Sequence, residues 1–283
     1  DLDVARKKLK DLESLIKLDN QNNDFTAYEN LNDQKAVFEI RKAGLNILMS
    51  MKGDKKGVAF IEDCAVTLEN LADYTERLRD VFRKYNTEGL FYAHASVGTL
   101  HVRPILNAKS EQDIKNMKAI AKEAFTMVKE YKGSHSGEHG DGIVRSEFHE
   151  MMFGKKIVGA FEDIKDTFDP KGLLNPGKIV RAFKSDDRTL MRYKPGYKAE
   201  NISTHYDWSA WGQLSDAVEM CNNNGACRKL DSGVMCPSYR VKMEEKKLDR
   251  GRANTLRLAL TNQLPEGSFA SKEKFETIEL CVS

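Results

Sequence analysis

The chain has 283 residues, with 45 basic and 43 acidic side chains and a formal net charge of +2. These charges are mixed along the chain without long blocks of one sign, which argues against a polyanionic partner such as nucleic acid. No apolar run reaches the roughly 18 residues that a membrane-spanning helix needs, and no signal peptide is visible. The chain starts at Asp1 and stops at Ser283, and we expect it to be a piece of a longer protein.

The five cysteines are unevenly placed: Cys64 stands alone, a group follows much later, and Cys281 is third from the end. An odd number of cysteines without a secretory signal predicts an intracellular protein. In such a protein metal ligation is favoured over disulfides.

The N-terminal part predicts two helices. Residues 1–19 are charged and helical in pattern, residues 20–33 are polar and predict a loop, and residues 34–50 have the apolar pattern of a well-buried helix. Residues 51–57 then form a turn-rich break.

The middle of the chain changes pattern. The apolar run at 58–66 predicts a strand, and a helix with three- and four-residue apolar spacing follows at about 68–82. Two β-rich runs then meet at Val97-Gly98 and predict a hairpin. Ser110 is expected to cap the next helix, with Asp113 at the capping-box position. The apolar stripe of this helix is predicted at Ile114, Met117, Ala121, Ala124, Val128 and Tyr131.

This order of strand, helix, strand, strand and helix predicts an α+β fold, in which helices cover one face of an antiparallel sheet. Helical segments are expected at 146–152 and 155–167, before proline and glycine interrupt the chain at 168–177. Residues 183–210 predict a linker. The part from 211 onward predicts helices around a cysteine group.

The hairpin carries the first candidate site. With the turn centred on Val97-Gly98, His94 and His101 would face each other with Cβ atoms about 4.5–5.5 Å apart. Glu138, in a glycine-rich segment, would add a third ligand. Two imidazoles and a carboxylate with open positions are typical of a catalytic metal site. The spacing alone leaves open that this segment is only a flexible surface loop.

His139 follows Glu138 directly, and in an extended segment its side chain would point the other way. It could therefore flank the metal as a general base without binding it. His135, three residues before Glu138, could support the ligands from outside.

Three segments carry a family resemblance: YAHASVGTLHVRP, SGEHGDG and FDPKGLLNPGK. Together they resemble the ferredoxin-like C-terminal cap domain of the FAD-linked oxidases of the vanillyl-alcohol oxidase superfamily, over roughly residues 36–181. This branch holds D-lactate, glycolate and D-2-hydroxyglutarate dehydrogenases. The resemblance implies FAD, a divalent metal (often zinc) on His94, His101 and Glu138, and His139 as the base on the substrate hydroxyl.

The resemblance also implies substrate and flavin contacts. Phe38-Glu39-Ile40-Arg41 is similar to a Trp-x-x-Arg motif that supplies a substrate-binding arginine, and Asn175 matches a segment that approaches the flavin ring. The hairpin departs from the common Gly-His-x-Gly-Asp-Gly-Asn-Leu-His pattern, and Arg103 stands where the family often has Asn. A guanidinium clamps a carboxylate well, so Arg103 is a candidate for that role.

The later cysteines resemble the Cys-x-x-Cys-x-x-Cys-x-x-x-Cys-Pro motif of bacterial ferredoxins, through Cys221, Cys227 and Cys236-Pro237. Asn224 replaces the second cysteine, and eight residues precede the Cys-Pro pair in place of three. The region is similar to the 4Fe-4S region of large bacterial D-2-hydroxyglutarate dehydrogenases, in which Cys281 would begin the next motif. Neither ligand set is complete, so we expect a cluster-poor chain with free thiols.

The resemblance divides the chain into four parts. These are a helical lead-in (1–50) from an FAD-binding domain expected before residue 1, the cap and substrate domain (51–182), a linker (183–210) and a truncated iron–sulfur helical domain (211–283). The parent would be a dehydrogenase of a D-2-hydroxy acid, with D-2-hydroxyglutarate favoured and D-lactate next. The metal would lower the hydroxyl pKa, His139 would take the proton, and hydride would pass to the flavin.

Electrons would then reach iron–sulfur centres and a downstream acceptor, and the chain alone is expected to be inactive. A cytoplasmic location is expected, with peripheral attachment to the inner membrane and homo-oligomer formation left open. Two other classes also stay open. One is a metal-dependent hydrolase using the same His/His/Glu site, and the other is a non-catalytic electron-transfer module.

Overall fold

The computed structural model describes residues 2–18, 26–231, 233, 235–265 and 267–281. It divides into two units, residues 1–48 and 49–283. The predicted domains 51–182 and 211–283 both lie in the second unit, and the four-part division stays a prediction.

The first unit contains α1 (Leu2–Leu18) and most of α2 (Leu31–Met49). Part of the predicted loop at 20–33 lies outside the described residues. The prediction of a well-buried second helix is wrong, because Phe38 and Ile40 of α2 are 59% and 69% exposed. A helical apolar pattern identifies a face, but burial also needs a partner surface, which the pattern does not supply.

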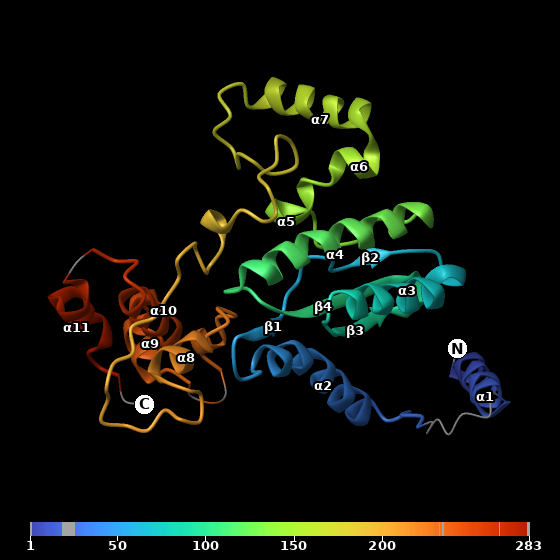
Figure 1. Cartoon of the computed structure of the whole chain (residues 1–283). Coiled ribbons are helices and arrows are strands. Elements are labelled where there is room, and N and C mark those ends of the chain that lie inside the picture. Colours follow the sequence, from blue (N-terminus) through green and yellow to red (C-terminus); the bar gives the residue numbers. More distant parts are fainter. Residues whose placement is uncertain (1, 19–25, 232, 234, 266, 282–283) are drawn as a thin grey trace. The chain divides into compact units, whose positions relative to one another are not determined.

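The second unit is built on an antiparallel sheet with β4 (Thr99–Asn107) at its centre. β3 (Gly89–His94) pairs along one edge of β4, while β1 (Lys55–Gly57) and β2 (Cys64–Ala65) pair along the other (Figure 1). The protein is therefore α+β, as the order of elements predicts.

The single strand predicted at 58–66 is wrong. The chain leaves β1, passes through a bend and enters β2, and residues 60–64 are buried without interruption. Asp63 has a φ of 58°, so the backbone cannot run straight through this segment. The bend places two acidic side chains, Glu62 and Asp63, inside the molecule.

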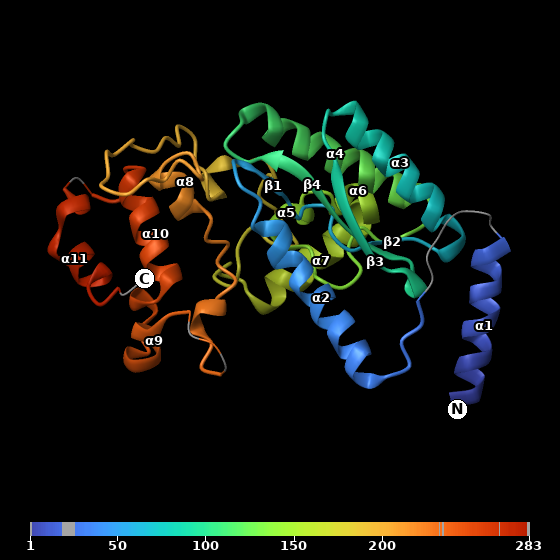
Figure 2. The same ribbon diagram turned by 90° about the horizontal axis from the view of Figure 1, so that it is seen from below.

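Side chains alternate along β4, and this alternation separates the core from the site. Leu100, Val102 and Leu106 join the hydrophobic core together with α3 (Leu71–Lys84) and α4 (Glu111–Glu130). α3 and α4 lie side by side along the sheet (Figures 1 and 2). Thr99, His101 and Arg103 occupy the intervening positions of β4, and therefore point to the opposite face.

The start of α4 forms as predicted. The Ser110 hydroxyl accepts the backbone N–H of Asp113, and the predicted apolar stripe is buried from Ile114 to Val128, whereas Tyr131 at the end of the helix is partly buried. The Asp113 carboxylate accepts the backbone N–H of Asn107 at 2.8 Å, so it ties the end of β4 to the start of α4.

The hairpin also forms, but its predicted register is wrong by two residues. A 3-10 turn at Ala95–Val97 separates the strands, so His94 pairs with Thr99, and Tyr92 pairs with His101. Gly98 ends this turn at a φ of 70°, and a Cβ there would lie 1.9 Å from the carbonyl oxygen of Val66. A shift of two residues keeps each side chain on its face, so His94 and His101 remain neighbours along a diagonal.

Short helices follow the glycine-rich segment: α5 (Gly142–Ser146), α6 (His149–Phe153) and α7 (Lys155–Phe168). The Pro- and Gly-containing residues 169–177 are not helical, as predicted. Later come α8 (Leu214–Glu219), α9 (Pro237–Lys242), α10 (Asp249–Leu260) and α11 (Lys272–Ile278).

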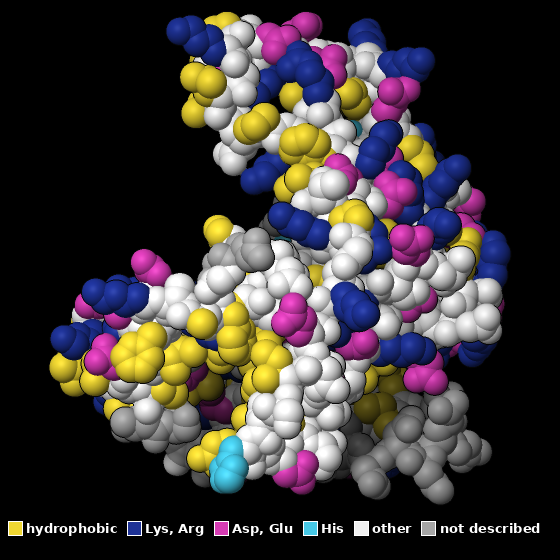
Figure 3. All heavy atoms as spheres, turned by 60° about the vertical axis from the view of Figure 1, so that its left-hand side comes forward, with side chains coloured by type: hydrophobic (Ala, Val, Ile, Leu, Met, Phe, Trp, Pro, Cys, Tyr) yellow, Lys and Arg dark blue, Asp and Glu magenta, His cyan; other side chains and the backbone are white. Residues whose placement is uncertain are grey.

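Within the part of the chain that the structure describes, no helix is both long and apolar enough to cross a membrane. Basic and acidic side chains are interspersed over the face shown in Figure 3, in keeping with the mixed charge of the sequence.

Candidate metal and substrate site

Three predicted ligands meet on the face of the sheet opposite the helices. His101 Nε2 lies 3.0 Å from Glu138 Oε1, and His94 Nε2 lies 3.5 Å from the same oxygen. The two imidazole centroids are 5.1 Å apart. One donor atom from each of the three residues lies within 4.8 Å of the others. This donor set fits a divalent cation, because two imidazole nitrogens and a carboxylate oxygen are suitable ligands at this spacing.

His101 is the buried member of the cluster. Its side chain is 2% exposed, whereas the His94 and Glu138 side chains are 43% and 44% exposed. Burial lowers the pKa of His101, and this effect exceeds the opposing influence of Glu62 and Glu138. The ring is therefore favoured in its neutral form, which is the form that binds metals.

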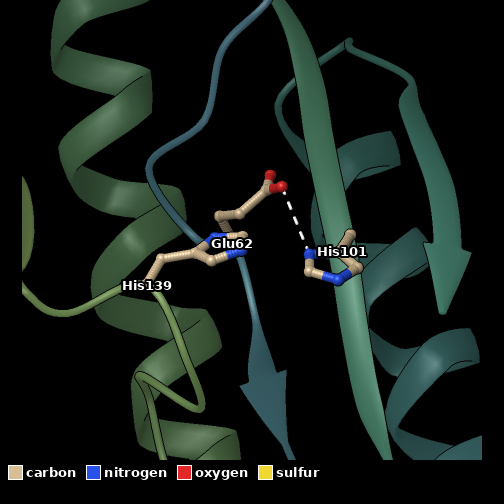
Figure 4. Close-up of side chains that lie close together, drawn as sticks. All are labelled: Glu62, His101 and His139. Carbon is tan, nitrogen blue, oxygen red and sulfur yellow. Dashed lines mark ion pairs between the residues drawn. The ribbon is translucent and has the colours of Figure 1, made fainter. Parts of the chain in front are cut away.

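Glu62 supports His101 from the bend between β1 and β2. Its carboxylate reaches toward the His101 ring, with Oε1 3.3 Å from Nδ1 (Figure 4). A carboxylate on the far ring nitrogen fixes the orientation and tautomer of a metal-binding histidine. Glu62 thereby leaves the Nε2 atom of His101 directed at Glu138.

Asp63 fixes the backbone of the glycine-rich segment. Its Oδ2 accepts the backbone N–H groups of Glu138 and His139 at 2.8 and 2.6 Å, and Arg145 donates to Oδ1. The Asp63 side chain is fully buried. Burial alone would raise its pKa, but the hydrogen bonds from His139, Glu138 and Arg145 lower it overall. A buried carboxylate therefore sets the positions of two predicted functional residues.

His139 lies within the cluster. Its ring stacks on His101 with centroids 5.2 Å apart, and its Nε2 lies 3.6 Å from Glu138 Oε1. The expectation that it points away from Glu138 is wrong because the segment is bent, with Gly140 at a φ of 74°. The His139 side chain is 47% exposed, so it can be reached from solvent.

A pocket of about 670 Å³ adjoins this cluster, and both His139 and Asn175 line it. The remaining wall is largely apolar and includes Phe161 and Ile164. Phe168 and Leu174, which also line it, are 81% and 63% exposed. Four charged side chains also line this pocket, and its apolar part with the Asn175 amide is compatible with a flat aromatic group such as the flavin ring.

The two predicted arginines lie in different surroundings. Arg103 is on β4 beside the cluster, with Nη2 3.0 Å from Glu62 Oε1 and a side chain that is 16% exposed. Within the described chain its Nε has no hydrogen-bond partner. Arg41 lies on α2 in the first unit, and its role in substrate binding stays a prediction.

The cysteines do not assemble a ligand set in the described part of the chain. All five are free thiols, and no metal-compatible group of three donors there includes a cysteine. Cys227 and Cys236 are buried against Leu248, whereas Cys281 is exposed. These residues as described therefore do not fit an iron–sulfur cluster, and the cluster assignment stays a prediction.

Sequence reasoning missed three residues of the site: Glu62, Asp63 and Arg145. One signal was available for the first two, since Glu62-Asp63 is the only charged pair in the apolar run from Val58 to Val66. Arg145 gave no comparable signal, because one arginine after a glycine-rich segment resembles any exposed basic residue.

Comparisons with known proteins identify the family of this chain. The family model described as "FAD linked oxidases, C-terminal domain" matches residues 2–179. The chain is 32% identical over 225 residues to a D-2-hydroxyglutarate dehydrogenase of Haemophilus influenzae, covering 78% of this chain and 21% of that protein. The corresponding protein of Pseudomonas putida is 33% identical over 222 residues, covering 78% and 22%.

A D-lactate dehydrogenase of Archaeoglobus fulgidus is 31% identical over 149 residues, covering 53% of this chain and 31% of that protein. The chain spans about a fifth of the length of the D-2-hydroxyglutarate dehydrogenases that it matches. Because the family model covers well over half of its residues, the chain belongs to the family of FAD linked oxidases, C-terminal domain.

Proposed function

We propose that this chain supplies the metal-binding and proton-accepting part of an FAD-dependent dehydrogenase of a D-2-hydroxy acid. D-2-hydroxyglutarate is the favoured substrate and D-lactate the next. The observation that carries the proposal is the meeting of His94, His101 and Glu138 beside His139, at the edge of an apolar pocket. The names of the matched relatives support the substrate class.

His94 Nε2, His101 Nε2 and Glu138 Oε1 would hold a divalent cation, for which zinc is a suitable candidate. Such an ion, when bound, acts as a Lewis acid that lowers the pKa of a substrate hydroxyl. Two of the three side chains are more than 40% exposed, so a small substrate can approach the donor set.

His139 would accept the proton of the 2-hydroxyl group. Its Nε2 lies on the same side as Glu138 Oε1, and its exposed ring can pass the proton on to solvent. The hydrogen bonds from the backbone N–H groups of Glu138 and His139 to Asp63 fix the backbone that carries this ring, which helps to position a general base.

Arg103 would bind a carboxylate of the substrate, with Arg41 as a second candidate. Glu62 binds the Nη2 end of the Arg103 guanidinium and so orients this side chain, which is 16% exposed, beside the cluster. FAD, when bound, supplies the two-electron acceptor chemistry, and Asn175 with the apolar pocket wall would contact its ring.

The test is a substrate panel on the FAD-loaded holoenzyme, with reduction of an artificial electron acceptor as the measured rate. D-2-hydroxyglutarate and D-lactate are compared with their L enantiomers. We expect His139→Asn to lower kcat by about 10²- to 10⁴-fold while metal content stays unchanged. His205→Asn is the matched control, since His205 lies outside the cluster.

Two results would contradict the proposal. One is full turnover of D-2-hydroxy acids by His139→Asn. The other is unchanged metal content in a His94→Ala/His101→Ala variant that retains the circular dichroism spectrum of the parent protein.

A further inference from the structure

A second group of metal-compatible side chains lies outside the site described above. His135 Nε2 is 3.3 Å from Asp141 Oδ1, and His149 Nε2 is 3.0 Å from Asp141 Oδ2. Donor atoms of these three residues lie within 4.8 Å of one another. Together with the first cluster, this group accounts for five of the six histidines in the chain.

This group is more buried than the first cluster. The His135 and His149 side chains are 1% and 3% exposed, and that of Asp141 is 18% exposed. The Phe125 and Phe153 rings lie 5.3 and 5.6 Å from His135, so the walls are apolar. Both ring nitrogens of His135 and the Nε2 of His149 lack a hydrogen-bond partner within the described residues.

The Nδ1 atom of His149 determines the tautomer of its neutral ring. Nδ1 lies 2.8 Å from the carbonyl oxygen of Ile179, which can only accept, so Nδ1 carries a proton. In the neutral ring Nε2 then presents a lone pair to a carboxylate oxygen at 3.0 Å. The contact is favourable when either a proton on Nε2 or a metal ion lies between the two atoms. Burial lowers the pKa of His149, but Asp141 and the Ile179 carbonyl raise it overall.

A backbone carbonyl on the far nitrogen is also what orients histidines that bind metals. The His135 side chain is 1% exposed and neither ring nitrogen has a hydrogen-bond partner among the described residues, so its ring is available as a ligand. The nearby cation, Arg145, donates to Asp63 and to the backbone carbonyl oxygens of Glu62 and Gly140. Its guanidinium is therefore not the partner of Asp141.

We propose that His135, Asp141 and His149 form a second metal-binding site, suited to zinc. Zinc–nitrogen bonds of about 2.0–2.1 Å place neighbouring tetrahedral ligands about 3.3–3.5 Å apart, close to the two separations measured here. The ligands come from the glycine-rich segment and from the first residue of α6. None of them belongs to the first cluster.

The ion at this second site is structural. It joins both ends of the segment that carries Glu138 and His139 to α6. The hydrogen bond from His149 to the Ile179 carbonyl oxygen then connects α6 to the segment that carries Asn175. The glycine-rich segment thus has one site on each side. The second site would hold the segment in place while the first site binds substrate.

The experiment measures zinc per chain in the His94→Ala/His101→Ala background, which removes two ligands of the first site. After saturation with zinc and dialysis, we expect one zinc per chain in this background. Adding His149→Ala should remove it, whereas adding His205→Ala should leave it unchanged. Zinc should also raise the melting temperature of the background protein, and it should not do so once His149 is replaced.

If His149→Ala does not fold, Asp141→Asn gives the same test with a side chain of nearly the same shape. The proposal is overturned if the folded background protein binds no zinc. In that case His149 and Asp141 are only an imidazolium–carboxylate ion pair beside His135. It is also overturned if His149→Ala and Asp141→Asn retain the zinc. Failure of the first site would appear separately, as equal zinc content in the parent and background proteins.

Discussion

Asp63 accepts the backbone N–H of His139 at 2.6 Å, although the two residues are 76 positions apart in the sequence. The same carboxylate receives Arg145, so a buried acid and a buried base together fix the segment that carries the proposed proton acceptor.

Asp63→Asn should therefore destabilise the protein strongly. Removing one partner leaves the Arg145 charge buried without compensation, which costs about 3–5 kcal/mol of unfolding free energy. Urea unfolding would measure the loss. Asp166→Asn is the control, because the Asp166–Arg181 pair is more than half exposed on both sides and should contribute under about 1 kcal/mol. Equal losses in both variants would contradict the assigned role of Asp63.

Glu62→Gln should weaken metal binding at the first site without abolishing it. The amide keeps the shape of the side chain but loses the charge that orients His101 through Nδ1. Loss of such an outer partner typically lowers metal affinity by about 10- to 100-fold. Competition with a chelator would measure this, with the exposed Glu69→Gln as control. An affinity equal to that of the parent protein would show that Glu62 does not orient the ligand.

Glu147→Gln should destabilise the protein in a pH-dependent manner. Burial alone would raise the pKa of Glu147, but Ser185, Lys184 and Lys118 lower it to about 2. The stabilisation is complete above the unfolded pKa of about 4.5 and disappears as pH falls through about 2. At pH 7 we expect the variant to lose about 1–3 kcal/mol of unfolding free energy. Unfolding at pH 7 and near pH 2 should show the two proteins converging at the lower value.

Gly98→Ala and Gly159→Ala should have opposite effects. Gly98 has a φ of 70°, and a Cβ added there would lie 1.9 Å from the carbonyl oxygen of Val66. Alanine at this position should therefore lower the free energy of unfolding by at least about 1–3 kcal/mol. Gly159 lies inside α7 with no atom within 4 Å of a new Cβ, and alanine should stabilise that helix by about 0.5–1 kcal/mol. Thermal melts of both variants provide the comparison.

The thiols should react in an order set by burial. Cys281 is exposed, whereas Cys64 is fully buried and its pKa is raised to about 12 by burial. A thiol reagent at pH 8 should modify Cys281 first and reach Cys64 only after denaturation. Mapping the modified residues over time would test this order, and early labelling of Cys64 would contradict it.

The sequence predicts the elements of this fold well where one local signal is sufficient. The stripe of α4 and its Ser110 cap are examples, because hydrophobic period and capping chemistry both act within a few residues. It fails for the bend at 58–63, where five consecutive buried residues remove the alternation that identifies a strand. It also fails for the exposed α2, because burial depends on a second surface.

The candidate site divides in the same manner. His94, His101 and Glu138 could be selected from residue chemistry and motif, and their shared face survives the error in register because that error is even. The position of Glu62 inside an apolar run is a local signal, but its contact with His101 could not be predicted. The same holds for the His135–Asp141–His149 group, because these contacts join separate segments of the chain. Pattern analysis identifies donor atoms but gives no distances between them.

The alternation of β4 has one more consequence. His101 lies between Leu100 and Val102, both of which are packed in the core, so this ligand cannot move away without opening the most protected strand of the unit. Asp63 holds the backbone of Glu138, but the Glu138 side chain is 44% exposed. We therefore expect hydrogen exchange to be slow at His101, and ion release to begin with detachment of the Glu138 carboxylate.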